Sequence, residues 1–133
     1  MNRAFTSPRT LALLLALSLA AFVPVASAGT TKRVKFARGR TSAVLKGSLG
    51  IEESITYVLG ARAGQTLILH VSIPDRQPNQ HVVFSISDPA GEDLLESYDT
   101  DWTGELTRTG DYKVVVSTFE SAPSSYVLEV TIR

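Results

Sequence analysis

The stretch Tyr57–Val71, YVLGARAGQTLILHV, decides the fold. On either side of a short polar segment, apolar residues recur at every second position, first at Tyr57 and Leu59 and again from Leu67 onward. This period of two is typical of β-strands that bury one face. Gly64 lies between the two runs and can adopt the positive φ that a tight turn needs. The stretch therefore predicts two strands joined by a hairpin turn.

The same alternation continues outward in both directions, and no segment after residue 32 shows a sustained helical period. The expected strands cover residues 32–37, 42–49, 54–60, 65–73, 80–87, 101–106, 110–118 and 124–132, with a further short strand or irregular turn near 93–97. The expected buried faces carry Ile55, Tyr57, Leu59, Leu67, Leu69, Val71, Ile73, Val82, Phe84, Ile86, Tyr112, Val114, Val116, Tyr126, Leu128, Val130 and Ile132. Polar side chains alternate with them, which is typical of two sheets packed face to face. The sequence predicts an all-β fold, namely an antiparallel β-sandwich of about eight strands with a jelly-roll-like arrangement.

Turn residues separate these runs for identifiable reasons. In the segment SDPAGEDL, Pro89 presets φ for a reverse turn and Asp88 can bond the backbone beyond it. Gly91 relieves the exit from the same turn, and Gly110 precedes a later strand in the same way. There is no internal repeat and no linker of low complexity, so we expect one domain.

The first 28 residues have the pattern of a secretory signal peptide. Basic residues precede an apolar run over residues 11–23, and small residues lead to an expected cleavage site after Ala28. The run is shorter than the roughly 20 residues that span a bilayer, so we expect no membrane integration. Residues 1–28 are therefore predicted to be the signal peptide, and residues 29–133 a single β-sandwich domain that is periplasmic or secreted. Because the chain has no cysteine, packing alone must hold this domain together.

Charge is unevenly distributed along the chain. Residues 29–46 contain basic residues and no acid, whereas acids predominate in residues 47–133. The basic residues of the leading segment are Lys32, Arg33, Lys35, Arg38, Arg40 and Lys46. In one interpretation these charges protect an exposed edge strand from pairing with other chains. In the other they bind an anionic partner, such as lipopolysaccharide, a wall polymer or an acidic protein surface.

No arrangement of side chains predicts catalysis or metal binding. His70 and His81 lie in expected strands at the parity opposite to the apolar set, and no further ligand follows either at metal-binding spacing. Asp99 and Asp101 match part of a calcium loop, but the remaining oxygen ligands of that loop are missing. We therefore expect no enzyme, no cofactor and no metal. Given the export signal, we expect no nucleic-acid partner either.

The segment Val34–Ile73, VKFARGRTSAVLKGSLGIEESITYVLGARAGQTLILHVSI, resembles the front half of the bacterial pre-peptidase C-terminal-like (PPC-like) domain. It has a glycine-marked strand, a hairpin with the pattern x-x-Y-x-x-x-A-x-x-G-Q-x-L, and a long apolar strand. The segments VVFSISDPAGEDL, GELTRTGDYKVVV and SSYVLEVTI resemble the rear half. The resemblance covers the whole expected domain and implies a PPC-like β-sandwich.

Within that group, an exported domain that begins V-x-F-x-x-G-x-x-S-A is similar to the periplasmic inhibitors of goose-type lysozyme from Gram-negative bacteria. This resemblance implies a binding protein without catalytic activity. Loops at one end of the sandwich would enter the cleft of a muramidase and shield its catalytic carboxylates. The partner implied is thus a goose-type lysozyme or another envelope protein.

Two loops carry this implication. In the family we associate binding with aromatic residues in the loop after the second strand and with arginines in the loop before the last strand. The first of these loops contains Ile51 and Glu52 here, and the second contains Phe119 and Glu120. If these loops bind a protein, we expect Ile51 and Phe119 to be the apolar anchors, and Glu52 and Glu120 to be carboxylates that match a basic rim.

The alternative is a cell-envelope module that binds a polyanion or a carbohydrate. It would use Lys32, Arg33, Lys35, Arg38 and Arg40 of the basic segment 32–46, or Trp102, which either stacks on a ligand or plugs the end of the sandwich core. A third interpretation is a chaperone-like structural partner of another exported protein. Ionic strength separates the first two classes, because polyanion binding weakens steeply as salt rises, whereas an apolar anchor in a cleft loses less.

Overall fold

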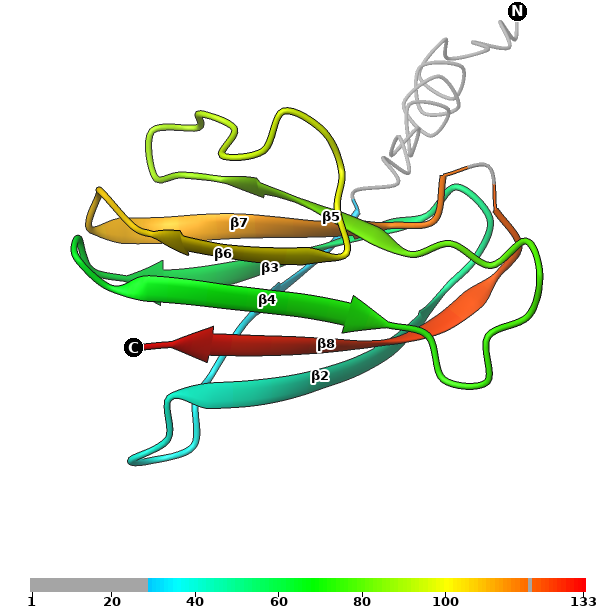
Figure 1. The fold of residues 1–133 in the computed structure, drawn as a ribbon, viewed down its shortest axis with the longest axis horizontal. Helices are drawn as coiled ribbons and strands as arrows, with labels where there is room; N and C mark the ends of the chain where they lie inside the picture. The colour runs from blue at the N-terminus through cyan, green and yellow to red at the C-terminus, as the bar shows by residue number, and fades with distance from the viewer. Residues whose placement is uncertain (1–28, 120) are drawn as a thin grey trace, which may run out of the picture.

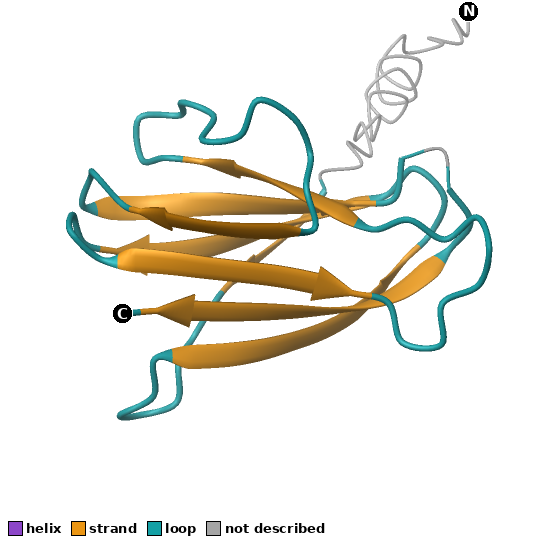
Figure 2. Cartoon of the chain, viewed as in Figure 1, coloured by secondary structure: helices purple, strands orange, loops and turns teal. Residues whose placement is uncertain are grey.

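Eight β-strands account for the alternating runs (Figure 1; Figure 2). The computed structural model describes residues 29–119 and 121–133, and it contains no helix in these ranges, hence none that could cross a membrane. The strands are β1 (Thr30–Arg33), β2 (Ser42–Leu49), β3 (Ser54–Ala61), β4 (Thr66–Ser72), β5 (Val83–Ser87), β6 (Asp101–Glu105), β7 (Gly110–Ser117) and β8 (Ser124–Ile132). The all-β fold class is thereby confirmed. The predicted signal peptide, residues 1–28, lies outside the described residues.

The strands form two four-stranded sheets, in the orders β1-β3-β7-β5 and β2-β8-β4-β6. Odd-numbered strands thus build one sheet and even-numbered strands the other, and every connection crosses between the sheets. Neighbouring strands are antiparallel except for β1 and β3, which are parallel. In Figure 1 the even-numbered sheet can be followed from β2 through β8 and β4 to β6. This arrangement confirms the predicted sandwich.

The core lies between the two sheets and is built from the predicted apolar faces. Phe84 and Val116 of one sheet and Leu67 and Leu128 of the other have no exposed surface. Burial of one such side chain stabilises the fold by about 1.5–3 kcal/mol. The alternation therefore identified the buried faces correctly, and Ile73 alone among the expected set is only partly buried.

The prediction of a hairpin around Gly64 was wrong. Gly64 does adopt positive φ, at 91°. However, β3 and β4 belong to different sheets, so residues 62–65 form an arch from one sheet to the other. The physical reason is that a hairpin turn and an inter-sheet arch need the same polar residues and the same glycine. The alternation on either side fixes which faces are buried, but it does not fix which strands are hydrogen-bonded.

The first strand begins earlier and ends earlier than predicted. Instead of residues 32–37, β1 covers Thr30–Arg33. Val34 is buried and still donates its N–H to the carbonyl of Val58 at 2.8 Å. Beyond it, the chain must leave the edge of one sheet to reach the other, and Phe36 packs against the core on the way. The apolar pair Val34 and Phe36 therefore belongs to a crossing segment rather than to a strand.

The long connection between β5 and β6 contains an irregular turn where a short strand was one expectation. Residues near 93–97 form only an isolated bridge, between Ser87 and Asp93. The preceding turn is held as predicted by Asp88, whose Oδ1 accepts the N–H groups of Ala90 at 2.8 Å and Glu92 at 2.9 Å. This carboxylate fixes the start of the connection.

Two tyrosines join the sheets through the core. The hydroxyl groups of Tyr57 on β3 and Tyr126 on β8 lie 2.6 Å apart, and both residues are buried. Burial and this hydrogen bond raise the pKa of Tyr126 above its ordinary value. Gly47, the residue paired with Tyr126 across the β2–β8 ladder, leaves the space that the phenol ring occupies. One glycine therefore makes room for the only polar contact that spans the core among the described residues.

A third tyrosine fixes the corner between β6 and β7. The hydroxyl of Tyr112 donates to the carbonyl of Arg108 at 2.7 Å and accepts the N–H of the same residue at 3.1 Å. Tyrosine corners of this kind, in which the hydroxyl bonds to backbone a few residues upstream, recur in β-sandwiches. Tyr112 itself is buried, so its ring packs in the core while its hydroxyl holds the turn.

Replacing Tyr112 with phenylalanine is expected to lower the free energy of unfolding by about 1–3 kcal/mol, because both backbone groups of Arg108 lose a partner. Chemical denaturation measures the change. Tyr98→Phe serves as the matched control, since the side chain of Tyr98 is about half exposed. A loss no larger than that of the control would show that water replaces the hydroxyl at the corner.

Candidate functional site

Three connections meet at one end of the sandwich, which we call the loop end. They are residues 50–53 between β2 and β3, residues 73–82 between β4 and β5, and residues 118–123 between β7 and β8. The pairing of Leu49 with Ser124 and of Ser54 with Ser117 brings the first and third of them together. The three lie on the right of Figure 1, opposite the C-terminus. The two loops implied by the resemblance are therefore adjacent.

Hydrogen bonds shape the loop that carries Ile51. Glu53 turns back so that its carboxylate accepts the N–H of Gly50 at 2.7 Å. Thr118, on the neighbouring loop, is fully buried and donates its hydroxyl to the carbonyl of Gly50 at 2.6 Å. Glu52 adopts a positive φ of 54° at the tip. The tight turn leaves the side chain of Ile51 63% exposed.

The loop that carries Phe119 is held in place by hydrogen bonds of a buried serine and of the backbone. Ser121 donates its hydroxyl to the carbonyls of Thr118 at 2.6 Å and His81 at 3.0 Å. The N–H of Ala122 bonds to the carbonyl of Asn79 at 3.0 Å, in the third connection. These bonds make one framework of the loops at this end. Glu120, the other predicted site residue of this loop, lies outside the described residues.

Phe119 is not alone on the surface, because Tyr98 packs against it. Their ring centroids are 4.8 Å apart with an interplanar angle of 68°, an edge-to-face arrangement, and both residues are about half exposed. Tyr98 is held there by the bridge between Phe84 and Asp99, with N–H to carbonyl distances of 2.8 and 3.0 Å. The structure therefore places an exposed aromatic pair at the loop end.

Sequence reasoning missed Tyr98. It lies in the non-periodic connection between β5 and β6, where no alternation indicates which way a side chain points. The one available signal was an aromatic residue among polar ones in a long connection, since long loops often carry function. Its contact with Phe119, twenty-one positions away, depends on the tertiary fold.

Beside the loop end lies a hollow of about 490 Å³ with charges of both signs. Glu52 and Glu53 line it from the loop, and Lys32 lines it from β1. Thr30 and Ser48 add polar surface. Glu52 is exposed and lies next to the exposed side chain of Ile51, so charged and apolar surface adjoin here.

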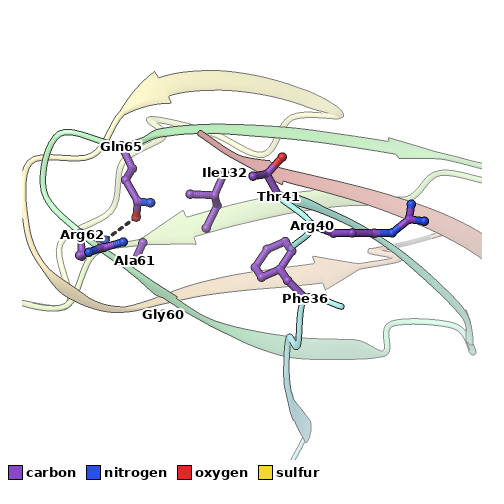
Figure 3. Close-up of a pocket in the computed structure, with 8 residues that line it drawn as sticks. All are labelled: Phe36, Arg40, Thr41, Gly60, Ala61, Arg62, Gln65 and Ile132. Carbon is purple, nitrogen blue, oxygen red and sulfur yellow. Dashed lines mark hydrogen bonds between the residues drawn. The ribbon is translucent and has the colours of Figure 1, made fainter. Parts of the chain in front are cut away.

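The predicted basic residues lie in different parts of the molecule. Arg33 reaches across the outer face of β3 to Asp111, with nitrogen–oxygen distances of 2.9 and 3.2 Å. Gly60 lies beneath the guanidinium, and a Cβ atom there would be 3.2 Å from it. This ion pair lowers the pKa of Asp111, chiefly through the hydrogen bonds from Arg33. Lys32 lines the hollow at the loop end, whereas Arg40 lines a cavity at the opposite end (Figure 3).

The two histidines, Asp99 and Asp101 all form hydrogen bonds with neighbouring groups of the protein. His70 Nδ1 is hydrogen-bonded to Asp101 Oδ1, and this bond lowers the pKa of the Asp101 carboxyl. Asp99 Oδ1 accepts the N–H of Thr100 at 2.7 Å. His81 contacts the guanidinium of Arg76 at 3.2 Å. Over the described ranges, no three acidic or histidine side chains come close enough together to hold a metal ion.

Trp102 belongs to the core rather than to an open surface. It is partly buried and packs against the buried cluster, on the same face of β6 as Gly104. Its ring lies over that glycine, where an added Cβ would be 2.5 Å from the indole. This position agrees with the interpretation in which Trp102 closes the sandwich.

Comparison with known proteins identifies relatives among solved structures, while a scan against protein-family models and a search of curated proteins found no match. PliG of Aeromonas hydrophila, a periplasmic inhibitor of g-type lysozyme, is 30% identical with a TM-score of 0.65, over 78% of this chain and 96% of that one. PliG of Salmonella Typhimurium is 20% identical with a TM-score of 0.60, over 79% and 99%. The pre-peptidase C-terminal domain of a Bacillus anthracis collagenase is 11% identical with a TM-score of 0.55, over 79% and 96%.

These matches confirm the resemblance from which the loop end was predicted. The Salmonella and Bacillus proteins share the β-sandwich at low identity, and the latter establishes that the fold is PPC-like. The likeness to the Aeromonas inhibitor is higher and extends over nearly all of that protein. The chain therefore belongs to the family of periplasmic inhibitors of g-type, or goose-type, lysozyme.

Proposed function

We propose that the protein inhibits a g-type lysozyme by placing its loop end in the cleft of the enzyme, without catalysing a reaction itself. The observation that carries this proposal is the exposed aromatic pair of Tyr98 and Phe119 at the end where the family loops meet. Membership of a family of such inhibitors supports it independently.

The apolar part of the contact is assigned to Ile51, Tyr98 and Phe119. When a partner covers large apolar side chains that are about half exposed or more, much apolar surface is removed from water. Aromatic residues are also enriched among the residues that contribute most to binding at interfaces. The loop 50–53 holds no aromatic residue, in contrast to what the resemblance implies. Tyr98, from a different connection, supplies an aromatic ring at the same end.

The polar part is assigned to Glu52 and Glu120, which would face basic groups around the cleft. Complementary rim charges chiefly accelerate association and select the partner, so their contribution depends on salt. The proposed location is the periplasm or the exterior, as predicted from the leader-like residues 1–28. The Aeromonas and Salmonella inhibitors are periplasmic proteins, which supports this location.

Titration of the purified protein into a cell-wall lysis assay tests the proposal. We expect stoichiometric inhibition of a g-type lysozyme, and no inhibition of a chicken-type lysozyme at the same concentrations. Raising the salt concentration from 50 to 200 mM should weaken inhibition by less than about 10-fold, because an apolar contact depends little on salt. Binding to a polyanion through many phosphate-type contacts would instead lose about 10³–10⁵-fold in affinity over that range. No inhibition of the g-type enzyme would refute the proposed function.

Charge reversal separates the proposal from the polyanion alternative. The double variant Lys35→Glu and Arg38→Glu changes exposed residues of the basic segment that lie away from the loop end. Inhibition of the lysozyme should be unchanged, since the contact is made by other loops. A loss of inhibition in this variant would favour binding through the basic segment.

A further inference from the structure

A cavity of about 290 Å³ opens at the end of the sandwich opposite to the loop end. Three elements that are distant in sequence form its walls: the crossing segment before β2, the arch between β3 and β4, and the end of β8. Figure 3 shows Phe36 and Ile132 on facing sides of this cavity, with Arg62 and Gln65 at one end and Arg40 and Thr41 at the other. Its volume approaches that of small-ligand sites, which begin near about 300 Å³.

The walls combine an apolar floor with donors of hydrogen bonds. Phe36, Ala61 and Ile132 supply the apolar surface, and each packs against or belongs to the core. Arg40 and Arg62 are the charged residues of the lining, and neither forms an ion pair with any described residue. In Figure 3 the side chain of Arg40 runs away from the other lining residues. No carboxylate lines the cavity. A ligand would therefore meet positive charge at the Arg62 end and apolar surface beyond it.

Gln65 presents a donor because of the bond that it already makes. Its Oε1 accepts the backbone N–H of Arg62 at 2.7 Å. A backbone N–H needs an acceptor, so the side-chain oxygen of Gln65 must be the atom that faces Arg62 N–H. The other polar atom of the amide, Nε2, therefore remains available as a donor. Gln65 and Arg62 lie at the same end of the cavity, as Figure 3 shows. This end thus offers an amide donor beside a guanidinium.

One acidic side chain close to the cavity is already neutralised. Asp111 lies beside Gly60, which contributes backbone to the cavity wall. Both of its oxygens accept hydrogen bonds from Arg33, so it does not compete for Arg62. A guanidinium binds a carboxylate through paired hydrogen bonds, which are about twice as strong as neutral ones.

From these observations we propose that the cavity is a binding site for a small organic carboxylate with an apolar body. The carboxylate binds at the Arg62 and Gln65 end, and the apolar body lies against Phe36 and Ile132. The site is separate from the loop end, so this binding activity goes beyond lysozyme inhibition and does not depend on it.

Two probes with the same apolar body test the proposal: 3-phenylpropanoate, which carries the carboxylate, and its neutral amide. Titrations of the purified protein are followed by the shifts of backbone amide resonances. We expect saturable binding of the acid, with the largest shifts at residues 36, 61–65 and 132. The acid should bind about 10-fold more tightly than the amide, as expected for a hydrogen bond to a charged group.

Variants identify the groups responsible. Arg62→Gln should weaken binding of the acid about 10-fold and leave binding of the amide unchanged, because only the charged contact is removed. Arg38→Gln is the matched control, since Arg38 is an exposed arginine of the same basic segment as Arg40 and lies outside the cavity wall. Saturating acid should leave lysozyme inhibition unaltered.

Three results with the unmodified protein would overturn the proposal. These are the absence of saturable binding, equal affinity for acid and amide, and shifts centred outside the cavity. An acid that binds equally well to the Arg62→Gln variant would also overturn it, because the carboxylate would then have another partner.

Discussion

Replacing Phe119 with alanine will raise the concentration of protein needed for half-inhibition of a g-type lysozyme about 100-fold, or about 2.7 kcal/mol of binding free energy. The aromatic pair presents two half-exposed rings at the loop end, and Phe119 follows Thr118, whose hydroxyl is bonded to the loop of Ile51. Truncation removes the ring that would be desolvated and also leaves Tyr98 without its packing partner. The lysis assay measures the change.

Val44→Ala is the matched control for this experiment. Val44 is 59% exposed, but it lies on the outer face of β2, away from the loop end. Its truncation should leave inhibition within about 2-fold of the unmodified protein, since isolated surface substitutions change little. The Phe119→Ala variant should stay folded, with a loss of about 1 kcal/mol or less, the value of one aromatic pair. Equal inhibition by both variants would exclude Phe119 as an anchor.

Tyr98→Ala then shows whether the two rings act as a unit. If they present one surface, the double variant Tyr98→Ala and Phe119→Ala should lose clearly less binding free energy than the sum of the single losses. Strict additivity would show that Tyr98 and Phe119 contact the enzyme independently or that one of them does not contact it.

Replacing Gly47 with valine will lower the free energy of unfolding by about 3 kcal/mol, the upper end of the usual cost of overpacking a core. An added Cβ would collide with the hydroxyl of Tyr126 and would lie 2.7 Å from Cζ of the same ring. Tyr126 cannot simply turn away, because its ring is buried and its hydroxyl is bonded to Tyr57. Displacement breaks that bond and leaves two buried hydroxyl groups without partners, each at a cost of about 1–3 kcal/mol.

Ser48→Val is the matched control, since it adds the same side chain one residue further along β2, on the exposed face. Its free energy of unfolding should change by about 0.5 kcal/mol or less. A second variant tests the cause. Combining Gly47→Ala with Tyr126→Phe removes the hydroxyl that collides first, so the double variant should be less destabilised than the sum of the single changes. Simple additivity would show that Tyr126 is not the group displaced.

Strand positions could be predicted well where alternation and burial agree. β2 and β8 match their predicted ranges without change, and β7 differs by one residue at its end, because in each of these strands one face is at least partly covered along the strand. β1 was displaced because Val34 is buried, and Phe36 partly buried, without belonging to a strand. Alternation of apolar residues predicts which side chains are buried. A segment is a strand only if it also has neighbours to which its backbone is hydrogen-bonded.

Pairing and the binding surface could not be predicted for a different reason. The arch at Gly64 has the sequence of a hairpin, and the choice between them depends on where β8 inserts. The same dependence on distant residues hides the contacts of Tyr98 with Phe119 and of Arg33 with Asp111. The family pattern located two of the loops at the candidate site, but the residues that complete their surface come from other connections.

The alternation of strands between the two sheets also determines when the molecule can assemble. β7 separates β3 from β5, and β8 separates β2 from β4, so the two last strands to be synthesised hold the middle of each sheet. A nascent chain that stops before residue 110 can form only the β1–β3 and β4–β6 pairs. Two-stranded pieces of this kind are marginal in water, and pairings between distant strands form slowly. Assembly of both sheets therefore waits for β7 and β8, so the earlier strands remain without most of their partners until these two have been made.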